Sequence, residues 1–188
     1  MSEIGTVVAL AGRRVDRGDE PVARFPLENV GYVREHIRKL FQKLRVQALV
    51  CSAACGADLI ALEEANALGI RSRVILPFSR SRFREVSVVD RPGDWAEKFD
   101  RTLDRASERG DVMVLDQAGS DSEAFLAANV RILDDAVLLA GQLAAKIAGI
   151  VVWDGTRRDS DATGDLAEQA RRRGIDVYEV ATIRVEKA

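Results

Sequence analysis

Residues 46–65 read VQALVCSAACGADLIALEEA, and this stretch predicts the fold. It begins with a continuous apolar run at 46–51, passes through small residues at 52–56, and continues as a segment rich in helix-forming residues. A continuous apolar run is typical of a strand that is buried on both faces of a parallel sheet. A helix that follows such a strand directly makes a strand–helix unit, the building block of α/β proteins.

The same alternation extends outward over the whole chain. Short apolar runs predict strands at 6–12, 46–52, 71–78, 111–116, 147–154 and 176–180. Segments of helical periodicity predict helices at 28–44, 57–68, 94–108, 122–144 and 164–173. Strands that alternate with helices indicate a parallel sheet covered on both faces. We therefore predict an α/β fold, a doubly wound Rossmann-like three-layer sandwich with a mainly parallel sheet of about six strands, as one domain over residues 1–188.

Composition agrees with a globular domain. The chain has 188 residues, 47% of them hydrophobic, and 28 Lys and Arg against 30 Asp and Glu give a net charge of −2. No apolar run approaches the roughly 18 to 20 residues that cross a bilayer, so we expect a cytoplasmic protein with no membrane partner. The balanced charge argues against nucleic acid as a partner, because nonspecific binding of nucleic acid needs a basic face. The sequence leaves open whether the protein forms a homo-oligomer.

The turn at 52–58 is the strongest local signal for a ligand site. Ser52, Ala54 and Gly56 are small, which lets backbone amides approach a ligand, and Asp58 opens the next helix. A helix N-terminus offers free N–H groups and a positive dipole end that suit phosphate. The alternative is a tight turn in which Asp58 is only a favourable N-terminal charge. In an open parallel sheet, ligands bind at the carboxyl ends of the strands, so we expect the cleft there.

Arginines follow two other strands. Gly12, Arg13 and Arg14 come directly after the first strand, and Pro77 ends the third, ahead of Arg82 and Arg84. In an extended segment, alternate side chains point the same way, so Arg82 and Arg84 could clamp an anion. The alternative for both groups is a solvated, charged loop. Because the connections at 12–26 and 78–93 are long, we expect them to close over the ligand as a rim.

The segment after the fifth strand supplies the last candidates, namely Asp154, Gly155, Thr163, Gly164 and Asp165. Thr163 is a plausible N-cap for the last helix, and a ligand phosphate or hydroxyl could share the amides of that first turn. For Asp154 the alternative is a turn at the end of a strand.

Familiar catalytic and cofactor motifs are missing from the sequence. His36 is the only histidine and lies in the middle of a predicted helix, so a Ser-His-Asp or Cys-His site has no base. Neither GxxxxGK[ST] nor GxGxxG occurs. Cys51 and Cys55 are too few for a disulfide framework or a zinc site, and we interpret them as reduced packing thiols. We expect no metal and no cofactor, and the catalytic residues, if any, stay unknown.

In this order and at this spacing, the motifs resemble those of the SLOG superfamily of Rossmann-like domains, related to the LONELY GUY phosphoribohydrolases and to the DNA-processing protein A fold. The segments that carry the resemblance are GRR at 12–14, SAACGADLIALEEA at 52–65, VILPF at 74–78, WDG at 153–155 and TGD at 163–165. The resemblance implies a nucleotide or nucleotide-derived ligand held across the strand ends, in a domain that serves many relatives as a sensor in signalling.

The chain departs from the hydrolase branch of that superfamily, which carries a PGGxGTxxE loop with a catalytic Glu. Here Ala162 precedes Thr163, and Leu166 stands at the Glu position. We therefore expect a binding or sensing module, with Arg14 as the main charged contact and Gly56→Val abolishing binding without loss of the fold. A phosphoribohydrolase-like N-glycosidase is the alternative, and an interaction module with a vestigial cleft is the third reading.

Overall fold

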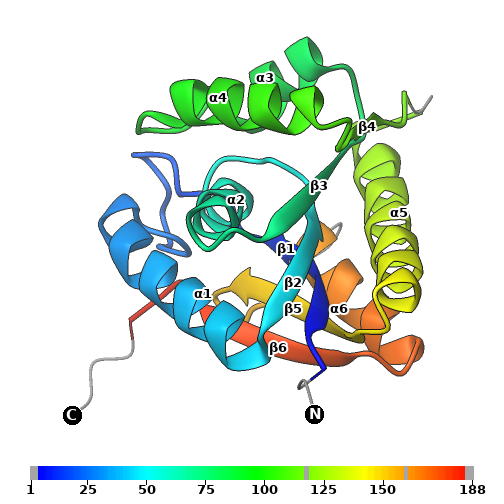
Figure 1. Ribbon diagram of the computed structural model, residues 1–188. Coiled ribbons are helices and arrows are strands. Elements are labelled where there is room, and N and C mark those ends of the chain that lie inside the picture. Colours follow the sequence, from blue (N-terminus) through cyan, green and yellow to red (C-terminus); the bar gives the residue numbers. More distant parts are fainter. Residues whose placement is uncertain (1–3, 117–118, 159–160, 185–188) are drawn as a thin grey trace.

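The computed structural model describes residues 4–116, 119–158 and 161–184. Six strands alternate with helices along the chain (Figure 1). The strands are β1 (Thr6–Gly12), β2 (Val46–Cys51), β3 (Arg71–Leu76), β4 (Val112–Val114), β5 (Lys146–Trp153) and β6 (Asp176–Ala181). The helices are α1 (Val30–Leu44), preceded by a 3-10 turn at Leu27–Asn29, and α2 (Ala57–Ala67), α3 (Arg80–Ser87), α4 (Trp95–Glu108), α5 (Asp121–Gln142) and α6 (Ala162–Arg172).

The strands form one parallel sheet in the order β4-β3-β2-β1-β5-β6. From β1 the chain moves outward through β2 and β3 to β4, and then returns to the other side of β1 to add β5 and β6. The direction of winding therefore reverses between β1 and β5, whose last paired residues are Gly12 and Val152. The predicted doubly wound fold is confirmed.

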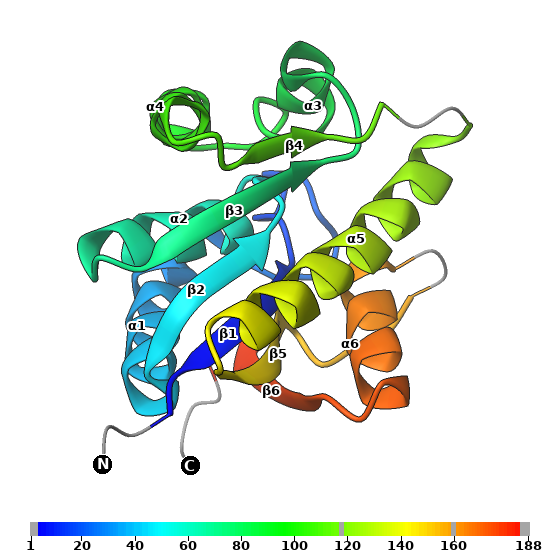
Figure 2. The same cartoon turned by 45° about the vertical axis from the view of Figure 1, so that its right-hand side comes forward.

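Helices cover both faces of the sheet, and alternate residues of each strand pack against the helices on opposite faces. Val8 and Leu10 of β1 pack into the apolar core beneath α1, α2, α3 and α4, whereas Val7 and Ala9 pack into the core beneath α5 and α6. All four of these side chains are fully buried. Figure 2 shows α5 and α6 together on one side of the sheet. Burial on both faces explains why the strands are continuous apolar runs.

One predicted connection is wrong. The segment 78–93 was expected to be an extended loop, but it contains α3. The Ser79 side chain caps this helix by accepting a hydrogen bond from the Arg82 amide. Phe83 is fully buried and stacks on Phe99 of α4, with ring centroids 6.0 Å apart. The arginines on either side of Phe83 fit an extended charged loop, so the sequence did not predict this short amphipathic helix. The limits of the other elements agree with the prediction to within about two residues.

Among the described residues, no helix is both long and apolar enough to cross a membrane.

Candidate functional site

A cavity of about 420 Å³ opens at the carboxyl edge of the sheet, between the segments that follow β1, β2 and β5 and the helices α3 and α5. Its volume falls in the range of small-molecule sites, and it lies beside the reversal of winding between β1 and β5. Seven of the predicted site residues line it, namely Gly12, Arg13, Arg14, Ser52, Ala54, Asp58 and Thr163. Eight do not, namely Gly56, Pro77, Arg82, Arg84, Asp154, Gly155, Gly164 and Asp165.

Gly56 supports the site by letting two segments touch. Its φ is +93°, and an added Cβ would lie 2.7 Å from the Arg13 carbonyl oxygen and 2.8 Å from the Val15 nitrogen. Gly12 is equally crowded, because its Cβ would lie 2.3 Å from the Cβ of Ala57. The segment after β1 therefore packs directly on the start of α2. The prediction that Gly56→Val would leave the fold largely intact is wrong, since the side chain would meet backbone and not a ligand.

Three amides of the 52–58 turn are used within the protein. The Ala54 amide donates to the Asp58 carboxylate at 3.2 Å. The Cys55 amide donates to the Ser87 carbonyl at 3.0 Å, and the Ala57 amide donates to the Arg13 carbonyl at 3.1 Å. These three amides are therefore not free to form the predicted phosphate cradle.

Arg13 joins two loops instead of facing a ligand with free donors. Its guanidinium donates to both carboxylate oxygens of Asp161 at 2.9 Å, to Asp154 at 3.3 Å and to the Thr156 carbonyl at 2.6 Å. Arg24 donates to the other oxygen of Asp154 at 3.2 Å. The Asp161 and Asp154 side chains are only 2% and 9% exposed. These ion pairs fix the segment after β1 to the segment after β5.

The start of α6 is capped by Asp161, not by the predicted Thr163. The Asp161 carboxylate accepts the Thr163 amide at 3.0 Å. Asp165 turns away from the cavity towards α5, where it accepts hydrogen bonds from Asn129 at 2.9 Å and from Gln169 at 2.7 Å. The predicted sharing of these amides with a ligand is not supported, because a protein carboxylate already occupies the helix end.

Gly155 and Gly164 have structural roles close to this helix. Gly155 has a φ of +78°, which allows the turn after β5, and an added Cβ at Gly164 would lie 3.5 Å from the Trp153 ring. Pro77 is buried at the end of β3. None of the three lines the cavity.

The arginines of α3 do not form an anion clamp. Arg84 pairs with Asp100 of α4 through two nitrogens at 3.0 and 3.1 Å. Arg82 pairs with Asp121 of α5 at 2.5 Å, and its guanidinium lies 4.2 Å from the centre of the Phe78 ring. Residues two apart on a helix point in different directions. These side chains therefore connect α3 to its neighbouring helices.

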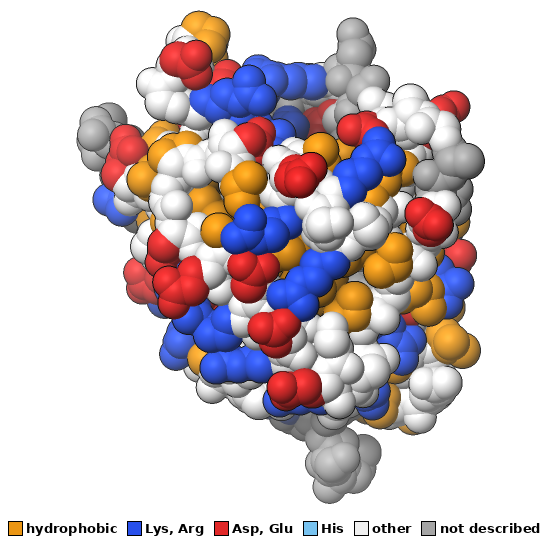
Figure 3. Space-filling view, turned by 90° about the horizontal axis from the view of Figure 1, so that it is seen from above, with side chains coloured by type: hydrophobic (Ala, Val, Ile, Leu, Met, Phe, Trp, Pro, Cys, Tyr) orange, Lys and Arg blue, Asp and Glu red, His pale blue; other side chains and the backbone are white. Residues whose placement is uncertain are grey.

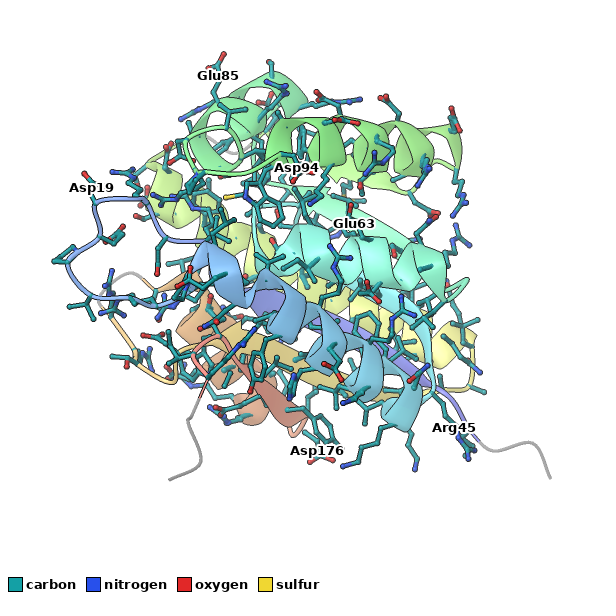
Figure 4. The ribbon with its side chains drawn as sticks, turned by 90° about the vertical axis from the view of Figure 1, so that its left-hand side faces the viewer. Asp19, Arg45, Glu63, Glu85, Asp94 and Asp176 are labelled. Atoms are coloured by element: carbon teal, nitrogen blue, oxygen red, sulfur yellow. The ribbon has the colours of Figure 1, made fainter. Side chains whose placement is uncertain are left out.

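The loop after β1 has a fixed base and a projecting tip. The Asp16 carboxylate accepts the amides of Arg24 and Phe25 at 2.8 and 2.9 Å, and Phe25 is fully buried. Figure 4 shows Asp19 at the outer tip of this loop, pointing away from the body of the protein. Closure of this tip over the cavity stays a prediction.

Four residues bring buried polar atoms to the cavity without a partner. Among the described residues, the buried side-chain atoms that lack a hydrogen bond are Arg24 Nε, Ser52 Oγ, Asp58 Oδ1, and Arg91 Nε and one terminal nitrogen of Arg91. All four residues line this one cavity. Buried polar groups are nearly always paired, because an unpaired one forfeits its hydration. The concentration of unpaired groups in a single cavity makes this cavity the candidate functional site.

Asp58 is the titratable group whose environment is most unusual. Its carboxyl is buried at the start of α2, and burial raises its pKa to about 7, against the opposing effect of the hydrogen bond from the Ala54 amide. Burial also raises the pKa of the Cys51 thiol, and that of Cys55 to about 12. Both cysteines are free and buried, so they are poor nucleophiles. Asp58 is therefore the side chain of this group that can exchange a proton near neutral pH.

Arginines outnumber acidic groups at one end of the cavity. Asp90 lies 2.8 Å from Arg14, 3.5 Å from Arg17 and 3.9 Å from Arg91. The Arg91 side chain is only 10% exposed, and burial, together with the charge of Arg14, lowers its pKa. Seen from above in Figure 3, basic and acidic side chains are mixed over the surface. Arg14 and Arg91 line the cavity and share this one carboxylate with Arg17, while Asp16 and Glu20 also line the cavity.

Sequence reasoning missed Arg24, Arg91 and Asp161. Asp161 carries a usable signal, because an Asp directly before a helical segment is a typical N-cap. Arg24 and Arg91 carry no such signal, because nothing in the neighbouring sequence distinguishes them from other arginines in charged loops.

The chain has a Rossmann-like fold. This is the fold that the resemblance to the SLOG superfamily implies. Among solved structures, the chain is similar to DNA processing protein A from Streptococcus pneumoniae, with a TM-score of 0.44 and 14% sequence identity over 94% of this chain and 59% of that chain. The chain thus spans less than two thirds of that protein, and the likeness concerns the fold alone. No protein-family model matches the chain, and no curated protein matches it.

Proposed function

We propose that the cavity binds a nucleotide or nucleotide-derived ligand, and that the domain is a binding or sensing module. The observation that carries this proposal is the convergence of Arg24, Ser52, Asp58 and Arg91, each with a buried polar atom that lacks a partner, on one cavity. Two of the four are cations, one is a hydroxyl and one is a carboxyl.

This set of groups fits a ligand with two kinds of polar end. Arg91 and Arg24 offer N–H donors to a phosphate, and charge-assisted hydrogen bonds of this kind are stronger than neutral ones. Asp58 Oδ1 is suited to accept a hydrogen bond from a hydroxyl or an amine, and Ser52 can donate or accept. A nucleotide carries phosphate, sugar hydroxyls and, on several bases, an amine. Arg14 contributes charge at the entrance, although it already donates to Asp90 and to the Val86 carbonyl.

Calorimetric titration and thermal unfolding with a panel of ligands test the proposal. The panel contains nucleoside mono-, di- and triphosphates, cyclic dinucleotides, nucleosides without phosphate, and inorganic phosphate. A ligand at 100 times its dissociation constant adds about 2.7 kcal/mol of stability, which is easily seen. We expect phosphorylated members to bind and nucleosides to bind weakly. No binding by any member at millimolar concentration would contradict the proposal.

Arg91→Met identifies the site in the same assay, with Arg105→Met as the matched control. Arg105 is exposed on α4 and does not line this cavity. Binding should be weakened about 10- to 150-fold in the first variant and retained in the second. Equal binding by both variants would place the ligand elsewhere.

A second candidate is a nucleotide-processing N-glycosidase, and the position of Asp58 favours it. A carboxyl whose pKa is near 7, in a ligand-sized cavity, is suited to donate or accept a proton during glycosidic-bond cleavage. Release of free base from a nucleoside monophosphate would establish this activity, and Asp58→Asn should abolish the release while ligand still binds. Stable binding without release of base would support the binding module.

A further inference from the structure

Two further cavities join into one groove beside α2, α4 and the start of β3. One has a volume of about 430 Å³ and is lined by residues of α1, α2, β3 and α4. The other, of about 530 Å³, shares Asn66, Ile70 and Arg109 with it. None of the residues that line these two cavities lines the candidate functional site. Figure 4 shows Glu63, one of the lining residues, on α2 between α1 and α4. We call the two cavities together the arginine groove.

Positive charge exceeds negative charge in the 430 Å³ cavity. Five arginines line it, against two glutamates. The Glu64 side chain is only 2% exposed and accepts hydrogen bonds from Arg34 at 2.8 Å and from Arg38 at 2.6 Å. Glu63 pairs with Arg34 at 2.6 Å and with Arg101 at 3.3 Å. Both carboxylates are therefore already engaged, and three positive charges remain in excess.

Arg105 and Arg109 are the free cations of the arginine groove. Both are exposed, and in the part of the chain that the structure describes neither guanidinium forms a hydrogen bond or an ion pair. Asp104, next to Arg105 in sequence, pairs instead with Arg80 of α3 at 2.6 Å. Positive charge is favourable in the last turn of a helix, which accounts for two cations at the end of α4. It does not account for the arginines that reach the same cavity from α1.

The spacing of the arginines on α4 matches an extended peptide. Arg101, Arg105 and Arg109 are four residues apart, so they lie along one side of the helix in steps of about 6 Å. In an extended chain, alternate side chains point the same way at intervals of about 6.6 Å. Carboxylates at alternate positions of an extended segment could therefore face successive arginines of this row.

The other lining residues favour a peptide over a nucleic acid. Single-stranded nucleic acid is typically bound by basic grooves that also carry aromatic side chains on which its bases stack. Among the described residues, no aromatic side chain lines the arginine groove. Asn66, Ser72 and Thr102 do line it, and their side chains can donate to and accept from a peptide backbone.

We propose that the arginine groove binds an acidic segment of a partner protein in an extended conformation, with carboxylates at alternate positions facing Arg101, Arg105 and Arg109. The guanidinium group matches a carboxylate in shape and charge. The groove already uses this pairing, because Arg34 and Arg101 hold the carboxylate of Glu63. This site is separate from the cavity proposed to bind a nucleotide, and it needs no nucleotide to form.

Two labelled peptides of identical composition test the proposal by fluorescence anisotropy at low ionic strength. Each contains three glutamates and three serines, in one peptide alternating and in the other as two blocks. In an extended conformation the alternating peptide presents three carboxylates on one side, against two for the block peptide. We expect the alternating peptide to bind more tightly, and added salt to weaken its binding. Equal affinity of the two peptides, or tighter binding of tripolyphosphate or of a single-stranded oligonucleotide, would overturn the proposal.

Substitutions locate the peptide on the protein. Arg105→Met should weaken binding of the alternating peptide about 2- to 5-fold, and Arg105→Met with Arg109→Met about 5- to 25-fold, as expected for one and two exposed ion pairs. Lys43→Met is the matched control, because Lys43 is also exposed but lies outside the groove. Arg91→Met should leave peptide binding unchanged, which separates this groove from the nucleotide cavity. Unchanged affinity in the double variant, or an equal loss in Lys43→Met or Arg91→Met, would refute the assignment.

Discussion

Arg91→Met should weaken ligand binding and, at the same time, stabilise the free protein. The Arg91 side chain is 10% exposed, and Nε and one terminal nitrogen have no hydrogen-bond partner. An unpaired buried polar group costs about 1 to 3 kcal/mol. Methionine keeps the apolar stem in place and removes both this cost and the repulsion from Arg14 and Arg17.

We expect the free energy of unfolding of the Arg91→Met protein to rise by about 1 kcal/mol, because the lost contact with Asp90 offsets part of the gain. For a chain of this length, that corresponds to a rise in Tm of about 2 to 4 °C. Asp90 keeps its 2.8 Å contact with Arg14, so it is not left unpaired. Loss of the charged hydrogen bonds to a phosphate should weaken binding by about 1.5 to 3 kcal/mol, or about 10- to 150-fold in Kd.

Urea unfolding followed by circular dichroism measures the first quantity, and calorimetric titration of a phosphorylated ligand from the panel measures the second. Arg105→Met controls for the general effect of removing an exposed positive charge. A fall in the free energy of unfolding in Arg91→Met would show that Arg91 is a structural residue. Unchanged affinity would show that the cavity does not hold the phosphate at Arg91.

Three further predictions follow from the pairing of the other groups. Arg13→Met should lower the free energy of unfolding by about 3 to 5 kcal/mol, because the buried carboxylate of Asp161 would lose its cation; an unchanged urea midpoint would contradict this. Gly56→Ala should cost about 1 to 3 kcal/mol through strain at positive φ, visible as a lower Tm in scanning calorimetry; an unaltered Tm would show that the contact with the Arg13 carbonyl relaxes freely. For Asp58 the folded-state pKa is about 7 and the usual value is 3.8, so the folded state holds the proton more tightly than the unfolded state. Wild-type stability should therefore fall as pH rises from about 4 to 7, by up to about 4 kcal/mol, and Asp58→Asn should remove this fall; parallel pH profiles of the two proteins would refute it.

Most of the fold could be predicted because continuous apolar runs, which indicate buried strands, alternate with segments of helical periodicity. Val7, Val8, Ala9 and Leu10 are all fully buried, and the only polar side chain of β1 is that of Thr6, so this strand is readily distinguished from an amphipathic helix. The α3 segment was missed because it is short and most of its residues are exposed. Only Phe83, Val86 and Ser87 carry its helical spacing, and the arginines between them fit an extended loop equally well.

The location of the cavity could be predicted from the sequence, because the carboxyl ends of parallel strands meet at one edge of the sheet. The roles of its residues could not. Arg13, Arg84 and Arg91 are the same residue type in segments of similar composition. Whether each guanidinium finds a carboxylate depends on where Asp161, Asp100 and Asp90 lie in space.

Pairing, and not residue type, separates the arginines that stabilise this fold from those available to a ligand. Arg13 holds both oxygens of a buried carboxylate, so its positive charge is already neutralised and its removal leaves Asp161 uncompensated. Arg91 is more buried than Arg13, at 10% against 15% exposed, but two of its nitrogens have no hydrogen bond to offset their dehydration. Under the proposed function, the ligand supplies the missing partner of this guanidinium. Arg13→Met should therefore lower the free energy of unfolding, whereas Arg91→Met should raise it slightly and weaken ligand binding. A fall in the free energy of unfolding in both variants would refute this division.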